Sequence, residues 1–492
     1  MKITFEKDLR RIKTDSFVFL CTEDKKDYNN LISLIQKSFR IKISEIFLKD
    51  FTGKDSQVQT FYYGNKRYIF SGLGKIEKID YDVIRKSTAK AVKAVDKFKQ
   101  QNTGICIPDI NKEGIDTGET AKVQAEAVVM ALYSFDKYKP EDKKRKTKNF
   151  VFFGLEKSIF EKGKVSDFVK EGKVIGESVN LARDLANEPS NYAYPETVAN
   201  IVEGMAKESG YNIKVYSRKE IKDMGMGGVI AVSQGSHNEP RFLEMSYNGN
   251  GKNKPMVIVG KGVTFDSGGI SLKPGSGMSE MKMDMSGAAA VIGTFNAVAK
   301  LKLKINLIGL IPLVENMPGG GAIKPGDVIK AHNGKYIEID NTDAEGRIIL
   351  ADALSYAKKF NPGYVIDLAT LTGAAIIVLG HIASPIMGND KSLVEKIIKA
   401  SEKTSEKVWE LPMWEEYEKM VESEIADVIN IGPPKQAGTI MGAVFLKAFV
   451  DKYPWVHIDI AGTAIVPKAG DYFPKGGTGA GVRLLVELLK SY

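Results

Sequence analysis

The stretch PMVIVGKGVTF, residues Pro255–Phe265, decides how the second half of the chain is expected to fold. It is an apolar run rich in β-branched residues, the composition of a strand that is buried on both faces. A helix of small residues is predicted next, over Ser286–Leu301, and a second buried strand over Ile305–Val314. Apolar strands that alternate with helices predict a mixed, mostly parallel sheet covered by helices.

The same pattern continues to the end of the chain. A hairpin is predicted over Val328–Asp340, with Asn333-Gly334 in a type I′ turn. Further strands are predicted over Tyr364–Gly373 and Val456–Ala464, and further helices over Ile348–Phe360 and Gly479–Tyr492. The sequence therefore predicts an α/β fold for this half.

The first half mixes shorter strands with amphipathic helices. Strands are predicted over Ser16–Cys21, Arg67–Gly74 and Asn149–Leu155, and helices over Asp82–Phe98 and Ala121–Tyr138. A polar helix over Ser166–Ala186 then ends in the turn-rich segment NEPSNYAYP. Because 492 residues are too many for one ordinary core, two domains are expected. We predict a smaller N-terminal α/β domain (1–160), a connecting helix and turn (161–191) and a larger C-terminal α/β domain (192–492).

Composition restricts the class of protein. The chain is 43% hydrophobic and 27% charged, as in globular domains. Its two cysteines, Cys21 and Cys106, form neither a disulfide framework nor a thiolate metal site. The N-terminus lacks the apolar core of a signal peptide, and no apolar stretch is long enough for a membrane span. A cytoplasmic location and no membrane partner are therefore expected.

The net charge of +9 favours acidic partners only weakly, because the lysines are scattered. The one dense basic cluster is KKRKTK, Lys143–Lys148, which is either a solvated loop or a nucleic-acid contact. A nucleic-acid partner is not expected from this cluster alone.

Polar residues and glycines gather just after the predicted strands. Sites in sheets of this kind form at the carboxyl ends of the strands. These side chains are therefore expected to lie together: Lys261, Asp266, Lys273, Asp284, Asp343, Glu345, Arg347, Thr370 and Gly373.

The acids among them suggest metal ions. Asp343 and Glu345 are two residues apart in NTDAEGRIIL (Asn341–Leu350), and in an extended chain both side chains would point to one face. Carboxylates held so close repel each other unless a cation lies between them. Any one acid alone would more simply be a helix cap or an ion-pair partner. With Asp266 and Asp284, however, the four acids suit two metals about 3.5–4 Å apart.

The remaining residue types limit the chemistry further. No two histidines lie close in sequence, and an oxygen-rich site by itself favours Mg²⁺ or Mn²⁺ over Zn²⁺. A lysine beside two dications either loses its proton and becomes a ligand or stays charged and stabilises an oxyanion. Lys261 and Lys273 are expected to divide these roles. Arg347 begins a helix, where its guanidinium and free backbone N–H groups predict an anion site.

Several of these segments resemble the leucine aminopeptidases, the two-metal cytosolic peptidases of the M17 family. NTDAEGR (Asn341–Arg347) is the signature of that family. VGKGVTFDSGG, MKMDMSGAAAV and the closing GTGAGVRLLVELL match in the same order and at compatible spacing. The resemblance covers about residues 165–492, including NEPSN, and the N-terminal part matches in layout only.

The resemblance implies a role for each site residue. Lys261, as a neutral amine, would hold the tighter metal together with Asp266, Asp284 and Glu345. Asp266, Asp343 and Glu345 would hold the more exchangeable metal, helped by the Asp343 carbonyl oxygen. Lys273 would polarise the scissile carbonyl, and Arg347 would hold a bicarbonate ion as general base. The family uses two zinc or manganese ions, so the resemblance adds zinc to the metals expected here.

The implied activity is hydrolysis of the N-terminal bond of peptides with a free α-amine. Leucine and other apolar residues would be preferred, and the implied role is intracellular peptide turnover. The implied substrate pocket consists of Met281, Thr370, Gly373, Ala461 and Ala464, although core packing explains the two alanines equally well. Some members have a bulkier residue in place of Ala464, so the pocket would be roomier here. The family also implies a homohexamer.

Two other functions fit parts of the sequence. Acids, a lysine and an arginine around two metals also suit a phosphoesterase or nuclease, although VGKGVTFDSGG does not fit the P-loop pattern. The net charge and Lys143–Lys148 suit a nucleic-acid-binding protein with a secondary peptidase site.

Overall fold

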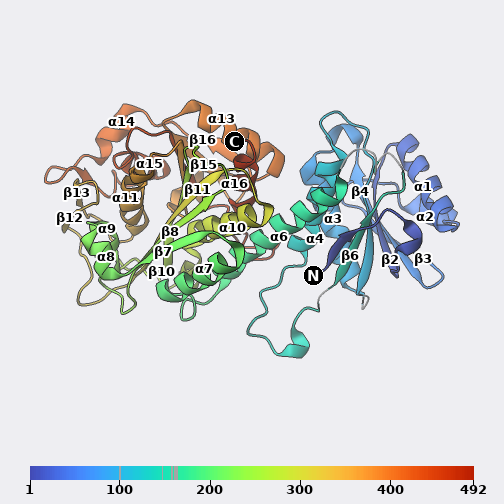
Figure 1. Ribbon diagram of the computed structural model, residues 1–492, viewed down its shortest axis with the longest axis horizontal. Coiled ribbons are helices and arrows are strands. Elements are labelled where there is room, and N and C mark those ends of the chain that lie inside the picture. The colour runs from blue at the N-terminus through green and yellow to red at the C-terminus, as the bar shows by residue number, and fades with distance from the viewer. Residues whose placement is uncertain (99–100, 147, 157–158, 160–163) are drawn as a thin grey trace. The chain divides into compact units, whose positions relative to one another are not determined.

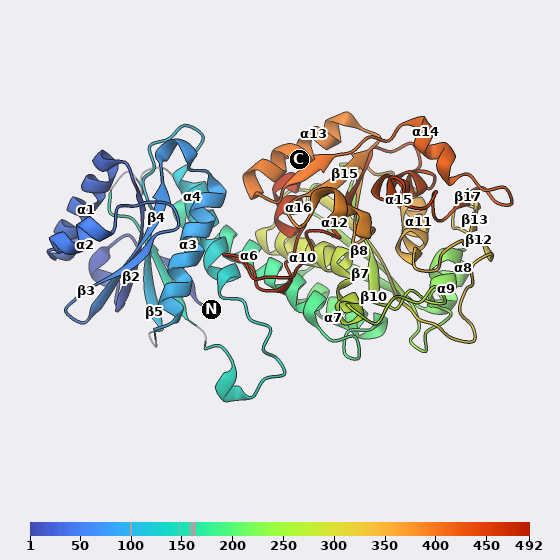
Figure 2. The same cartoon turned by 180° about the vertical axis from the view of Figure 1, so that it is seen from behind.

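A computed structural model describes residues 1–98, 101–146, 148–156, 159 and 164–492 (Figures 1 and 2). The chain divides into two compact units, residues 1–180 with 469–474 and residues 181–468 with 475–492. The division falls within helix α6 (Val165–Asn187). The predicted boundary between residues 160 and 161 lies outside the described residues, and the predicted limits of the connecting segment stay a prediction.

The first unit contains a six-stranded sheet in the order β1-β6-β5-β2-β4-β3. All neighbours pair parallel except β3, which is antiparallel to β4. Its strands are β1 (Ile3–Phe5), β2 (Ser16–Thr22), β3 (Val58–Tyr63), β4 (Lys66–Gly74), β5 (Asn102–Cys106) and β6 (Asn149–Phe153).

Successive residues of β2 point to opposite faces of this sheet, and they are apolar on both faces. Helices therefore cover both faces. Phe17 and Phe19 pack with α1 (Lys25–Phe39) and α2 (Glu45–Asp50). Val18 and Leu20 pack with α3 (Tyr81–Asp96) and α4 (Thr117–Ala131). Helix α4 was predicted over residues 121–138, and both ends were wrong. The helix starts earlier, at Thr117, because the Asp116 side chain caps it by accepting the N–H of Glu119. It ends at Ala131, although apolar residues continue to Tyr138.

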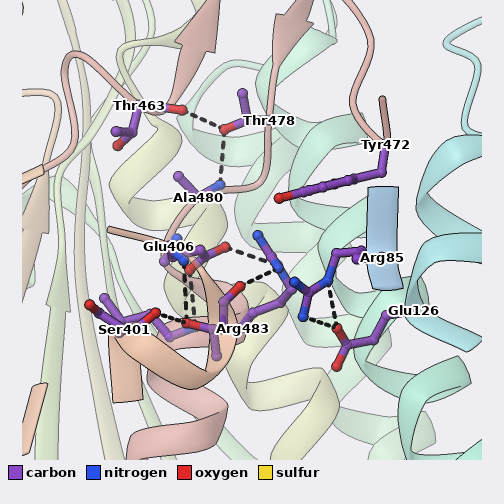
Figure 3. A network of polar contacts seen from close by, with 12 residues as sticks. Arg85, Glu126, Ser401, Glu406, Thr463, Tyr472, Thr478, Ala480 and Arg483 are labelled. Carbon is purple, nitrogen blue, oxygen red and sulfur yellow. Dashed lines mark hydrogen bonds and ion pairs between the residues drawn. The ribbon is translucent and has the colours of Figure 1, made fainter. Parts of the chain in front are cut away.

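A late segment of the chain, residues 469–474, belongs to the first unit. Within this unit Arg85 pairs with Glu126 at 3.1 Å, and both side chains are buried (Figure 3). The Arg85 guanidinium lies 5.7 Å from the centre of the Tyr472 ring, and the Tyr472 hydroxyl donates a 2.9 Å hydrogen bond to Asp82. The buried ion pair therefore also anchors the late segment.

The second unit is built on a larger mixed sheet in the order β16-β15-β18-β14-β9-β11-β8-β7, with β10 also paired to β11. Five pairings are parallel and three antiparallel, which confirms the predicted fold class. The strands are β7 (Asn212–Tyr216), β8 (Arg241–Asn248), β9 (Met256–Gly260), β10 (Gly262–Asp266), β11 (Asn306–Asn316), β14 (Tyr364–Ala369), β15 (Ser384–Gly388), β16 (Val408–Glu410) and β18 (Trp455–Asp459).

Two groups of helices cover this sheet (Figures 1 and 2). Helix α10 (Ser286–Leu301) contacts β9, β11 and β14, and packs with α7 (Pro195–Ser209) and α16 (Val482–Leu489). Helix α11 (Glu345–Ala357) contacts β9 and β11 and packs with α9 (Gly227–Ser233) and α15 (Gly438–Lys447). The other helices of this unit include α8 (Arg218–Asp223), α12 (Gly373–Leu379), α13 (Lys391–Thr404) and α14 (Glu415–Glu418).

Two sequence predictions in this unit were wrong in detail. Residues 255–265 form two strands rather than one, because the chain breaks at Lys261 between β9 and β10. The hairpin of β12 (Val328–Lys330) and β13 (Tyr336–Glu338) lacks a type I′ turn, since only Gly334 has a positive φ, of 90°. Its N–H bonds to Ala331 O, as in a type I turn followed by a glycine bulge. Short pairs also form between β13 and β17 (Val428–Ile429) and between β19 (Ile465–Val466) and β20 (Gly476–Gly477).

Three of the five cationic side chains in the basic cluster Lys143–Lys148 have partners within the first unit. Lys144 pairs with Glu141, Arg145 with Asp96, and the Lys148 ammonium donates to Phe98 O at 2.8 Å. Thr147 lies outside the described residues. Within the described part of the chain, no helix combines the length and hydropathy that a membrane span requires.

Glu406 holds the start of the closing helix of the second unit, α16, in place. Its carboxylate pairs with Arg483 at 3.3 Å (Figure 3) and accepts the N–H groups of Gly481 and Leu484 at the start of α16. Glu406→Ala removes the carboxylate that faces a buried guanidinium and two backbone N–H groups, so we expect the free energy of unfolding to fall by about 3–5 kcal/mol.

Urea unfolding followed by tryptophan fluorescence measures this change, because Trp409, Trp414 and Trp455 all lie in the second unit. Glu402→Ala, which removes an exposed acid on α13, is the matched control. Equal losses in the two variants would contradict the assigned role of Glu406.

Candidate metal centre

The carboxyl ends of β18, β14, β9 and β11 meet at one edge of the second sheet, where four adjacent strands run parallel. Lys261 directly follows β9, Asp266 ends β10 and Asn316 ends β11. Thr370 follows β14, and Asp459 ends β18. The predicted gathering of polar side chains at strand ends is therefore present, as expected for sheets of this kind.

Three carboxylates form the centre of this group. Asp266, Asp343 and Glu345 each place an oxygen within 4.8 Å of the other two. Asp266 and Glu345 are 2% and 1% exposed, whereas Asp343 is half-buried. Such closely spaced, buried acids are costly without a compensating positive charge.

Two lysines lie between the acids. The Lys261 Nζ is 2.8 Å from Asp284 Oδ2 and 2.9 Å from Glu345 Oε1. The Lys273 Nζ is 2.8 Å from Asp266 Oδ2 and 2.5 Å from Asp343 Oδ1. All four predicted acids and both predicted lysines are thus brought together in one cluster.

The path of the chain through the NTDAEGR segment differs from the prediction. Asp343 lies in a turn, its N–H bonded to Asn341 Oδ1 at 2.8 Å, and Glu345 is the first residue of helix α11. The argument from two side chains on one face of an extended chain is therefore wrong. Both acids reach the cluster because a turn leads directly into a helix.

Close packing requires glycine at two positions beside the acids. A Cβ on Gly346 would lie 2.6 Å from Lys261 Cε, so any other residue there would push the lysine away from Glu345. Gly268 has a φ of +88°, and a Cβ there would lie 2.9 Å from Asp343 Oδ1.

The charges of the cluster are strongly coupled. Burial raises the pKa of Asp284, Glu345 and Asp343, and repulsion from Asp266 adds to the effect on each. Burial would lower the pKa of Lys261, but attraction to Asp284 and Glu345 outweighs it and raises the pKa. The pKa of Lys273 is raised in the same way, mainly by Asp266. Without a further cation, the buried acids therefore hold protons more tightly than free carboxyls do.

Unsatisfied oxygens test whether these residues suit metal ions. Glu345 Oε2 is buried with neither a hydrogen bond nor an ion pair among the described residues, and a lysine ammonium is the one partner given there for Glu345 Oε1, Asp284 Oδ2 and Asp343 Oδ1. Buried polar atoms are normally satisfied, so these oxygens call for a cation. Carboxylate oxygens with one nitrogen donor are ligands that Mn²⁺ and Zn²⁺ accept. The donor set therefore fits divalent metal ions.

Sequence reasoning missed the residues that hold the ligands in place. Asn316 donates to Asp266 Oδ1 at 2.8 Å and to Thr342 O at 3.0 Å, and the Thr342 hydroxyl donates to Gly268 O. Asp459 accepts the N–H groups of Leu371 and Ala461 and the Thr372 hydroxyl. The available signal was a polar residue at the end of a buried strand, which is rarely placed there without partners.

The five predicted substrate residues occupy different environments. The Thr370 hydroxyl donates a hydrogen bond to Asp284 Oδ1 at 2.7 Å, and the Thr370 backbone carbonyl accepts one from the Lys261 ammonium. Thr370 therefore contacts two residues of the cluster. Gly373 begins α12 and is exposed, and Ala461 is half-buried beside Asp459. Met281 is half-buried in a short 3₁₀ helix (Met278–Met283), whereas Ala464 is 1% exposed, which suits core packing as well as a pocket floor.

Arg347 lies in the first turn of α11, next to the cluster. It is 7% exposed, and its Nη1 donates to Asn430 O at 2.8 Å, while Nε is buried without a hydrogen bond. Burial lowers the pKa of Arg347 to about 10, partly offset by Glu345 and Asp459, and the group stays charged at neutral pH. A buried guanidinium with an unused donor at a helix start suits a small anion.

Comparison with known proteins agrees with this geometry. Residues 180–486 match the catalytic domain of the cytosol aminopeptidase family, Peptidase M17, and residues 18–142 match its N-terminal domain. A probable cytosol aminopeptidase of Syntrophotalea carbinolica is 41% identical, with 97% of each chain covered. The cytosol aminopeptidase of Pseudomonas aeruginosa is 42% identical over 86% of this chain and 85% of its own.

Solved structures agree as well. A variant of tomato leucine aminopeptidase superposes with a TM-score of 0.88 at 28% identity, covering 100% of this chain and 97% of its own. The bottromycin maturation enzyme BotP, in complex with Mn, gives a TM-score of 0.86 at 31% identity and covers 97% and 99% of the two chains. Both family domains, a long relative above 40% identity and the acidic cluster agree: the chain belongs to the M17 cytosol aminopeptidase family and is a metal-dependent aminopeptidase.

Proposed function

We propose that this aminopeptidase removes leucine and other apolar residues from the N-termini of peptides, using two divalent ions. The observation that carries the proposal is the buried cluster of Asp266, Asp343 and Glu345, with a lysine on each side of it. Its biological role would be peptide turnover inside the cell, in the cytoplasm.

Two overlapping ligand sets are available in this cluster. Lys261, Asp266, Asp284 and Glu345 would hold the tighter ion, and Asp266, Asp343 and Glu345 the more exchangeable one, with Asp266 and Glu345 shared. Mn²⁺ and Zn²⁺ are the proposed metals. When bound, two such ions acidify a water molecule and give the substrate amine and carbonyl fixed positions.

The residues of the chain supply the remaining parts of the reaction. The Lys273 ammonium, 21% exposed at the edge of the cluster, would donate a hydrogen bond to the scissile carbonyl oxygen. It would stabilise negative charge there more in the transition state than in the ground state, which is the requirement for catalysis. Arg347 would hold bicarbonate as the general base, and its unused Nε supports an anion there.

The preference for apolar residues would come from the side chains around the cluster. We propose Met281, Thr370, Gly373, Ala461 and Ala464 as the substrate-binding residues. Because alanine occupies position 464, the pocket would accept a side chain as large as that of leucine. The substrate would need a free α-amine because the metal ions would hold that amine in a fixed position. Only the first peptide bond would then reach the reacting water.

A homohexamer is the proposed assembly. Helix α12 begins at the substrate-binding Gly373 and exposes several large apolar side chains, together with the turn that follows it: Ile376, Ile377, Val378 and Ile382. Ile377 is 87% exposed, and clustered apolar side chains of this kind are typical of subunit contacts. Sedimentation velocity tests the assembly, and a monomer at micromolar concentration would contradict it.

The alternative functions have weaker support. Lys144, Arg145 and Lys148 have partners within the first unit, so only part of the basic cluster, including the exposed Lys143 and Lys146, is available to nucleic acid. A two-metal phosphoesterase would use similar acids. The deciding assay compares leucine p-nitroanilide with a phosphate diester on metal-loaded protein. We expect turnover of the anilide, with leucine above glycine or aspartate in a panel of aminoacyl anilides; turnover of the diester alone would reverse the assignment.

Metal binding should be linked to proton release. The raised pKa of Lys261 keeps it protonated at neutral pH, so serving as a neutral ligand requires the loss of one proton. The apparent affinity of the tighter ion should therefore rise about tenfold for each pH unit around neutrality. Titration of Mn²⁺ in buffers of different protonation enthalpy measures the released protons. Lys261→Met should lower the release by one, and affinity independent of pH would refute the ligand role of Lys261.

Substitutions of Glu345 and Lys273 should have different effects on metal binding and turnover. Glu345→Ala removes the proposed shared ligand, so we expect loss of turnover by more than about 10³-fold and weaker binding of both ions. Lys273→Ala removes the carbonyl donor, so kcat should fall by roughly 10²–10³-fold while two ions are retained.

Metal analysis beside steady-state kinetics distinguishes these outcomes. Lys282→Ala, at a lysine that donates to Asn187 O in the same unit, serves as the matched control. Retention of two ions and most of the activity in Glu345→Ala would contradict the shared-ligand role. Metal loss in Lys273→Ala would mean that the two lysines have the opposite roles.

A further inference from the structure

A cavity of about 550 Å³ lies in the second unit, away from the metal cluster. Three segments line it: the turn of the β12–β13 hairpin, the end of α11 and the connection from α15 to β18. Glu345 and Arg347 lie at the start of α11, so the length of the helix, about 20 Å, separates them from this cavity. None of the proposed metal or substrate residues is among the described residues that line it. The cavity is therefore a separate candidate site.

Positive charge dominates the lining of this cavity. Each of the three segments contributes one lysine, and these are Lys335, Lys358 and Lys452. The one carboxylate in the described lining is that of Asp451, which pairs with Lys358 at 2.6 Å. The ammonium groups of Lys335 and Lys452 have no partner among the described residues. Three lysines against one aspartate leave two positive charges, which an anion would balance.

The dipole of α11 does not account for this charge. Lys358 directly follows α11 and complements the negative end of that helix. Lys335 comes instead from the hairpin, and Lys452 from the segment before β18, and neither belongs to a helix. Lys335 is also half-buried, where an ammonium group without a counterion is only partly solvated. Two lysines from different segments thus point to a ligand of opposite charge.

The hairpin adds two polar groups whose roles in hydrogen bonding are fixed. Asn333 Oδ1 accepts the N–H of Lys335 at 3.1 Å, which leaves the Asn333 amide group free to donate. The Ser355 hydroxyl donates to Asp352 O, so its oxygen accepts the Nδ1–H of His332 at 3.1 Å. Burial lowers the pKa of His332, so the ring is neutral at neutral pH and its accessible Nε2 is an acceptor. The cavity therefore offers a donor and an acceptor besides its lysines.

We propose that this cavity binds a small phosphorylated molecule with a hydroxyl-bearing body, such as a sugar phosphate. Lys335 and Lys452 would bind the phosphate, whose two negative charges match the net charge of the lining. The Asn333 amide would donate to a phosphate oxygen, and His332 Nε2 would accept a hydroxyl of the body. A planar carboxylate is better matched by arginine, which is absent from the described lining. The volume lies in the range of small-molecule sites, and the site is independent of the proposed peptidase function.

The binding experiment uses ribose 5-phosphate and isothermal titration calorimetry on the full-length protein. It is performed with the Mn²⁺-loaded protein and again in EDTA, because a phosphate ester also binds metal ions. We expect saturable binding of similar affinity under both conditions. Ribose, without the phosphate, and succinate, a dicarboxylate of the same charge, should bind about tenfold more weakly or worse.

Variants assign the binding to the cavity, because Arg347 offers a second anion position. Lys335→Gln combined with Lys452→Gln should weaken ribose 5-phosphate about tenfold or more. His332→Phe should weaken ribose 5-phosphate but leave the affinity for inorganic phosphate unchanged. Lys252→Gln combined with Lys304→Gln removes the same charge from exposed lysines outside the lining, and this matched control should bind as the wild type does. Circular dichroism confirms that each variant is folded.

Four results would overturn the proposal. Absence of saturable binding in EDTA would place the phosphate at the metal ions instead. Unchanged binding in the double lysine variant of the cavity would place it elsewhere on the chain. Equal affinity for ribose or succinate would remove the role of the phosphate, and an unchanged affinity of His332→Phe for ribose 5-phosphate would remove the role of the hydroxyl-bearing body.

Discussion

Mutual repulsion among four carboxylates is the constraint on which the second unit depends. Asp266, Asp284, Asp343 and Glu345 lie close together beside the carboxyl ends of the strands, and all but the half-buried Asp343 are buried, where water screens charge poorly. In the protein alone, Lys261 and Lys273 lie between them and partly neutralise them. Two ammonium groups against four carboxylates leave an excess of negative charge, which divalent ions would balance. The arrangement that is least stable as a bare protein core is thus the one best suited to hold metals.

The surrounding fold serves to keep these charges at fixed distances. Parallel strands bring residues from distant parts of the sequence to one edge of the sheet, and α10 and α11 cover its two faces. Gly346 lets Lys261 approach Glu345, and Asn316 and Asp459 hold the adjoining loops. Each of these contacts acts on a backbone segment or a side chain of the cluster, so a small displacement at any of them would alter the geometry of the whole centre.

Much of this could be predicted from the sequence because its signals are local. Helix α10 occupies the predicted residues Ser286–Leu301, since a run of small apolar residues has few alternatives. The acids could be selected because they lie in polar, glycine-containing segments between apolar runs of the sequence. Asn316 and Asp459 also end apolar strands, but the contacts that they make could not be predicted, because their partners Asp266 and Leu371 lie far from them in the sequence. The break at Lys261 and the turn at Gly334 were missed because tertiary contacts and backbone dihedrals determine them.

The most direct test of the account is to count and locate the bound ions. Crystals of the protein saturated with Mn²⁺, measured at the manganese absorption edge, would give anomalous peaks at each site, and elemental analysis would give the stoichiometry. The account predicts two ions per chain, both in contact with Asp266 and Glu345 and one of them also bound to the Lys261 nitrogen. A single ion, or ions bound away from this cluster, would contradict it.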